Sequence, residues 1–159
     1  MFVSMNSIGQ KAMKNLFTSE AGDYSVSYPK IWYFVENPNT DFIFIAPSEN
    51  GKLFNENINL IKTSFQGVSE KDYTQKTLYQ LNQLLVEFYI IKQNEVIINN
   101  IEYKKITYTH SVNGMKIKVC YYLTFYKDYA YGFTCSSLAE NFSKDLLIFE
   151  TIIESLKYN

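Results

Sequence analysis

His110 is the only histidine of the chain, so a Cys-His pair or a Ser-His-Asp triad would have to be built on it. It shares the apolar side of a predicted strand with Ile106 and Tyr108. No nucleophile and no orienting acid can be located around it, and the sequence has no nucleophile elbow, phosphate-binding loop or dinucleotide fingerprint. We therefore interpret His110 as a structural residue and expect a protein that is not an enzyme.

Carboxylates occur in two near pairs that could serve acid-base chemistry or hold a metal. Glu70 with Asp72, and Glu150 with Glu154, both fall on the polar faces of predicted helices. A metal loop with oxygen ligands needs several carboxylates in a short segment that contains glycine. We interpret both pairs as solvated helix faces and expect no metal and no other cofactor.

Every positive charge of the chain is a lysine, because the sequence contains no arginine, and the formal net charge is −1. Recognition of phosphates and base edges relies on the planar guanidinium fork, which lysine lacks. The sequence therefore argues against a nucleic-acid partner. No apolar stretch approaches the roughly 20 residues that span a bilayer. The first 16 residues do not form an intact signal peptide. We expect a cytoplasmic protein or, alternatively, an exported one whose export signal is missing from this chain.

The 14 Tyr and 12 Phe residues favour a strand-rich structure. Residues 1–18 are expected to form a loosely ordered arm, with a short helix around residues 11–17, and residues 19–159 a single domain. Alternating polarity predicts strands at residues 24–28, 31–35, 42–46, 58–65, 90–98, 102–112, 115–126 and 129–136.

Apolar residues at three- and four-residue steps predict two amphipathic helices. The first covers residues 69–88, with Ser69 as its N-cap. The second runs to Leu156 at the end of the chain, after a capping box of Ser137 and Glu140. The order of these elements predicts an α+β fold: a mostly antiparallel sheet of about six to seven strands with helices packed on its faces.

Two tight turns set the expected strand register. Asn113-Gly114 is a strong hairpin signal, and it places Val112 opposite Met115. By the same pairing, Tyr108 faces Val119 and Ile106 faces Tyr121.

For the next hairpin, a left-handed Asp128 would place Phe133 opposite Tyr121 and Cys135 opposite Val119. Cys120 and Cys135 would then lie on opposite faces of the sheet as two free, ordinary buried thiols.

Six side chains share one face of the strands at residues 102–112 and 115–126, namely Lys105, Thr107, Thr109, Lys116, Lys118 and Tyr122. This face contains too many lysines for a buried core, and too many long and aromatic side chains for a surface that contacts only solvent. We predict that it binds another protein. In one alternative, the helix over residues 69–88 covers the face and the lysines only border that contact. In another, binding uses the loops around Asn37 and Asn50.

Five segments resemble PsbP/Mog-type proteins, and it is their order that is specific. Residues 24–32 (YSVSYPKIW) resemble the opening strand of PsbP-like domains, residues 42–47 (FIFIAP) their second hairpin strand, and residues 58–61 (INLI) the strand after it. Residues 96–103 (VIINNIEY) resemble their central hairpin, and residues 149–157 (FETIIESLK) their terminal helix.

The resemblance implies an α-β-α sandwich. PsbP/Mog-type proteins include photosystem II subunits, Ran-binding Mog proteins, bacterial lipoproteins and secretion chaperones, so it also implies protein binding without catalysis. We therefore expect a non-enzymatic accessory or chaperone-like domain. A small-ligand or metal carrier of the cell envelope is the alternative.

Overall fold

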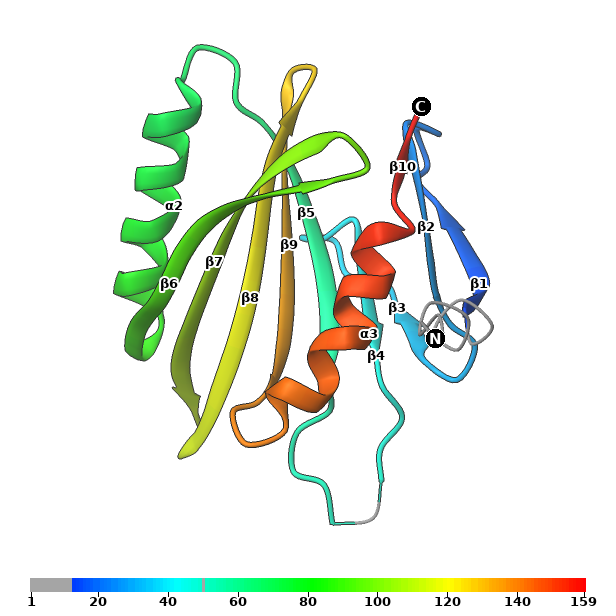
Figure 1. Cartoon of the computed structure of the whole chain (residues 1–159), viewed down its shortest axis with the longest axis vertical. Helices are drawn as coiled ribbons and strands as arrows, with labels where there is room; N and C mark the ends of the chain where they lie inside the picture. Colours follow the sequence, from blue (N-terminus) through cyan, green and yellow to red (C-terminus); the bar gives the residue numbers. More distant parts are fainter. Residues whose placement is uncertain (1–12, 50) are drawn as a thin grey trace, which may run out of the picture.

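The computed structural model describes residues 13–49 and 51–159, which form two antiparallel sheets and two helices (Figure 1). A three-stranded sheet has the order β1-β2-β10, from β1 (Met13–Thr18), β2 (Tyr24–Pro29) and β10 (Lys157–Tyr158). A seven-stranded sheet has the order β3-β4-β5-β9-β8-β7-β6. Its strands are β3 (Tyr33–Val35), β4 (Phe42–Ile45), β5 (Asn57–Ser64), β6 (Val86–Ile98), β7 (Ile101–Val112), β8 (Met115–Tyr126) and β9 (Tyr129–Leu138).

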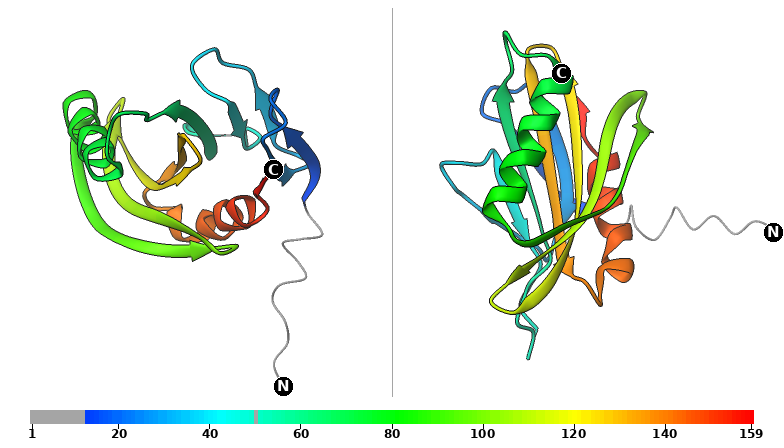
Figure 2. Two further views of the ribbon diagram at one scale, coloured as in Figure 1. Left: turned by 90° about the horizontal axis from the view of Figure 1, so that it is seen from above. Right: turned by 90° about the vertical axis from the view of Figure 1, so that its left-hand side faces the viewer.

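The helices lie on opposite faces of the curved seven-stranded sheet (Figure 2). Helix α2 (Glu70–Leu84) packs its apolar side against Ile106, Tyr108 and Val119. Helix α3 (Phe142–Glu154) shares the other core with Tyr122 and with the three-stranded sheet. The predicted α+β class, with a mostly antiparallel sheet and helices on its faces, is confirmed.

Helix α2 begins as its sequence predicts and ends earlier than expected. The Ser69 side chain accepts a hydrogen bond from the backbone N–H of Asp72 at 3.0 Å, which satisfies one free donor of the first turn. The helix ends at Leu84, not at Phe88, because β6 begins at Val86. A bulge follows directly, with Glu87 at φ 54°.

The hairpin between β7 and β8 has the predicted register. Asn113 and Gly114 adopt φ of 49° and 78°, and Val112 pairs with Met115. Two residues with positive φ make a turn whose twist matches that of the strands. The side chains of this hairpin therefore reach the faces assigned to them from the sequence.

The predicted register between β8 and β9 is wrong by one residue. Lys127, at φ 54°, takes the left-handed conformation in place of Asp128, and the loop contains only two residues, so that Tyr126 pairs with Tyr129. Cys120 consequently pairs with Cys135. Both free thiols lie on the same face and are buried, which corrects the expectation of opposite faces.

The two ends of the described chain were predicted poorly. Residues 13–18 form β1, which pairs with β2, and not a short helix or a loose arm. The rest of the expected arm, residues 1–12, lies outside the described residues. The chain ends on β10 and not on the helix. The proposed capping box is also wrong, because Ser137 still belongs to β9 and the N-cap of α3 is Asn141.

Candidate functional site

Helix α3 packs across much of the face that the sequence suggested as a binding surface. Tyr122 and Thr109 are buried there, and Thr107 Oγ1 lies 3.5 Å from the Cys120 sulfur. The helix over residues 69–88 does not cover this face, because α2 packs on the opposite side.

Two of the predicted lysines hold α3 in place. Lys105 Nζ lies 3.2 Å from Glu150 Oε1 and 5.1 Å from the centre of the Tyr122 ring. Lys118 Nζ lies 5.0 Å from the centre of the Phe142 ring at the start of α3. Of the six predicted residues, Lys116 alone is exposed.

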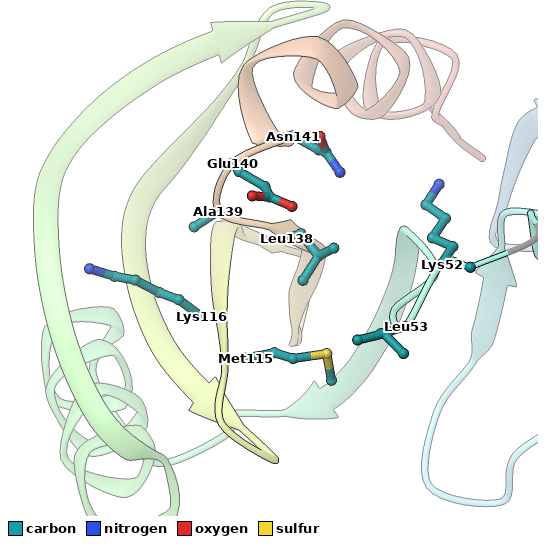
Figure 3. Close-up of a pocket in the computed structure, with 9 residues that line it drawn as sticks. Lys52, Leu53, Met115, Lys116, Leu138, Ala139, Glu140 and Asn141 are labelled. Atoms are coloured by element: carbon teal, nitrogen blue, oxygen red, sulfur yellow. The ribbon is translucent and has the colours of Figure 1, made fainter.

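Lys116 lies at a pocket of about 590 Å³ between the β4–β5 loop, the start of β8 and the connection from β9 to α3 (Figure 3). We call it the Leu53 pocket. The residues that give it its character are Lys52, Leu53, Met115, Lys116, Leu138 and Glu140.

The Leu53 pocket combines apolar side chains with flanking charges. Leu53 is 80% exposed, and with Met115 and Leu138 it offers an apolar surface. Lys52 borders the pocket, whereas the Lys116 side chain runs away from it, so that the Lys116 ammonium group lies outside the hollow (Figure 3). Such a site fits a ligand with an apolar body.

Lys52 belongs to an ionic cluster beside this pocket. Its Nζ lies 2.7 Å from Glu56 Oε2, and Glu56 is only 4% exposed. Burial raises the pKa of Glu56, but the hydrogen bond and the charge of Lys52, together with a backbone hydrogen bond, outweigh burial, and the net pKa is lowered. The ion pair between Lys52 and Glu56 therefore stabilises the β4–β5 loop, and the Glu56 carboxylate is largely shielded from solvent.

Asp145 of α3 completes the cluster. It accepts a hydrogen bond from the Ser137 hydroxyl. Burial raises the pKa of Asp145, the Ser137 hydrogen bond opposes that rise, and the nearby Glu56 charge adds to it. Two carboxyl groups and one ammonium group thus connect the β4–β5 loop with α3. The sequence offered no signal for this cluster, because Asp145 lies far from Lys52 and Glu56 along the chain.

A second, acidic pocket of about 970 Å³ lies beside the loop around Asn37. Asp23 and Asp41 line it, and Asp41 accepts a hydrogen bond from the backbone N–H of Lys62 at 2.8 Å. Burial raises the pKa of Asp41. Burial also raises the pKa of Asp23, but hydrogen bonds from Lys62 and Ser19 lower this pKa, and the result is about 2. The acidic pocket therefore already holds one cation, the Lys62 ammonium group, paired with Asp23.

The two pockets lie at the two loops that the sequence suggested as the alternative. Asn37 lines the acidic pocket, and Gly51 lines the Leu53 pocket, while Asn50 itself lies outside the described residues.

The structure also places His110 and the acidic side chains that could hold a metal. No group of three or more His, Cys, Asp or Glu side chains in residues 13–49 and 51–159 could hold a metal ion. His110 is half-buried opposite Ile117, and burial lowers its pKa. No helix of this part of the chain is long and apolar enough to cross a membrane.

The chain is similar in fold to several solved structures, although no family model and no curated protein matches it. CyanoP, the PsbP of Synechocystis, superposes with a TM-score of 0.69 at 16% identity, over 100% of this chain and 98% of that one. PA94, a Pseudomonas aeruginosa protein of unknown function, gives 0.65 at 14% identity, over 91% and 96%. LpqN of Mycobacterium tuberculosis, described as involved in cell envelope biogenesis, gives 0.65 at 11% identity, over 98% and 96%.

Identities this low show the fold alone. At that level the resemblance found in the sequence is confirmed, since the structural neighbours include a PsbP-type protein.

Proposed function

We propose that this chain is a non-enzymatic accessory domain that binds another protein through the Leu53 pocket. One observation carries the proposal: Leu53 stands 80% exposed at an apolar hollow whose lining also includes the charged residues Lys52 and Glu140. Exposed apolar side chains gathered within a polar rim are typical of protein-interaction sites. The similarity to CyanoP supports an accessory role, and both the cytoplasm and the cell envelope are compatible with it.

The charges of the pocket indicate the chemistry of the partner. Leu53 with Met115 favours an apolar side chain. The exposed Lys116, whose ammonium group points away from the hollow, favours a carboxylate at the edge of the contact, while the Lys52 charge is already paired with Glu56. The partner would therefore present a segment in which an apolar residue neighbours an acidic one. Lys105 and Lys118 of the predicted face act indirectly in this proposal, because they hold α3 and with it one wall of the pocket.

Capture from native extract, with two pocket variants, tests this function. Leu53→Asp and Lys116→Glu change the pocket, while Leu84→Asp and Lys76→Glu serve as matched controls on α2. Leu84 is 78% exposed, close to the value for Leu53, and Lys76 is exposed as Lys116 is. We expect proteins that the wild type and both controls retain and that both pocket variants lose, at unchanged melting temperature. Equal capture by all five proteins would contradict the proposal.

A small ligand is the second candidate, because about 590 Å³ falls within the roughly 300–1,000 Å³ of small-molecule sites. Native mass spectrometry of the protein purified from its own cells separates the two. A bound mass that Leu53→Asp abolishes would favour the ligand, and a ligand-free protein that captures a partner would favour the accessory domain.

A further inference from the structure

Cys120 and Cys135 face each other across the two central strands of the structure. They are directly paired in the antiparallel ladder between β8 and β9. Both side chains are on the face that α3 covers, with 1% and 0% of their surface exposed. The chain has two cysteines, and the fold brings them together.

The backbone geometry of such a pair suits a disulfide without any strand movement. Directly opposed residues of an antiparallel ladder have Cα atoms about 4.5–5.5 Å apart, and disulfides bridge Cα atoms about 4.4–6.8 Å apart. Opposed side chains also project to the same side of the sheet. The pairs on either side, Tyr122 with Phe133 and Lys118 with Ser137, hold this register.

We propose that Cys120 and Cys135 are a disulfide site, closed during folding by exchange with a small disulfide such as oxidised glutathione. Two S–H bonds are lost and one S–S bond forms. Two electrons and two protons pass to the oxidant, whose own disulfide becomes two thiols. The inference is independent of the proposed function, because neither cysteine lines the Leu53 pocket.

Burial decides when this exchange takes place. In the folded domain both sulfurs are shielded from solvent, and burial raises the pKa of Cys135, which keeps it in the unreactive thiol form. Oxidation therefore occurs before α3 packs, or during transient opening of the core. Once formed, the bond is shielded by the same core from attacking thiolates.

Refolding the full chain from denaturant under two redox conditions tests the proposal. One sample refolds with mixed oxidised and reduced glutathione and the other with dithiothreitol. Free thiols are then alkylated in denaturant and the intact mass is measured. We expect two alkyl groups after refolding in dithiothreitol and none after refolding in glutathione. We also expect the oxidised monomer to melt higher by on the order of 5–10 °C.

Cys120→Ala and Cys135→Ala are the controls. Each should retain one alkylatable thiol in both buffers and lose the redox-dependent shift in melting. Two alkylated thiols on a natively folded, glutathione-refolded wild type would overturn the proposal, as would glutathione adducts or disulfide-linked dimers in place of the internal bond. A second test uses protein that has never been unfolded, incubated for a long time with the thiol oxidant diamide. If both thiols can still be alkylated after this incubation, the proposed disulfide is contradicted.

Discussion

The Tyr121 side chain lies against the backbone of Gly132 on the neighbouring strand. A Cβ atom placed on Gly132 would be 2.9 Å from Cζ of the tyrosine ring, closer than real side-chain contacts allow. Gly132 sits mid-strand in β9, opposite Leu123 of β8 and Ile61 of β5. The missing side chain at position 132 thus provides the space that the Tyr121 ring fills on the α2 side of the sheet.

Gly132→Ala should lower the free energy of unfolding by about 1–3 kcal/mol, because the added methyl group overpacks this contact. Tyr121→Leu in the same chain should recover part of that loss. Urea unfolding of the two single variants and the double variant measures their coupling. Strictly additive effects would show that the two residues do not share this space.

Phe149→Ala should destabilise the domain by about 3–5 kcal/mol, since it empties a fully buried site. Phe149 is 0% exposed, and its ring meets Trp32 edge to face at 6.2 Å between centroids. Leu147→Ala on the same helix is the control, because Leu147 is 70% exposed and should change stability by less than about 0.5 kcal/mol. Similar melting of both variants would mean that the apolar stripe of α3 faces solvent.

Asp23→Asn should weaken the fold at neutral pH and lose its effect in acid. The folded-state pKa of Asp23 is about 2, below its ordinary 3.8, because hydrogen bonds from Lys62 and Ser19 outweigh burial. The ionised carboxylate therefore stabilises the fold above pH about 4, and this stabilisation is lost as the pH falls toward about 2. After allowance for solvent screening we expect about 1–2 kcal/mol at neutral pH. Unfolding measured across this range checks it, with exposed Glu20→Gln as control. A difference between wild type and Asp23→Asn that persists at pH about 2 would contradict the assignment.

Lys52→Met should cost more than Glu56→Gln. Removing the lysine leaves the buried Glu56 beside Asp145 without its cation, and breaking a buried ion pair costs about 3–5 kcal/mol. Glu56→Gln instead removes one of two neighbouring carboxylates and leaves Lys52 free to pair with Asp145.

The two variants should also differ in their response to pH. In Lys52→Met the remaining carboxyl groups bind protons more tightly in the folded state than in the unfolded one. Stability should therefore rise as the pH is lowered from about 7 to about 5, while Glu56→Gln stays nearly flat. Chemical unfolding at both pH values measures this, and a reversed order of the two variants would refute the role assigned to Lys52.

The sequence by itself determined the elements whose cause is local. The Asn113-Gly114 turn could be predicted because both residues tolerate the positive φ that the hairpin needs, and the Ser69 cap because its acceptor serves a donor three residues away. The apolar stripe of α3 follows from helical spacing, and Phe149 is buried as that stripe implies.

Only the tertiary structure decided features that depend on residues far apart in the chain. Nothing local distinguishes a left-handed Lys127 from a left-handed Asp128, so the register that joins Cys120 to Cys135 was set by packing across β8 and β9. The sheet face that carries Lys105 and Tyr122 is largely covered by α3 and is not an open binding surface. A helix packs on the sheet face that buries most of its apolar side, and the sequence of one strand does not show which face that is. The Leu53 pocket also depends on residues far apart in the chain, because it forms where the β4–β5 loop lies beside the start of α3. The alternation of polar and apolar residues along a single strand does not indicate which distant segments lie next to it.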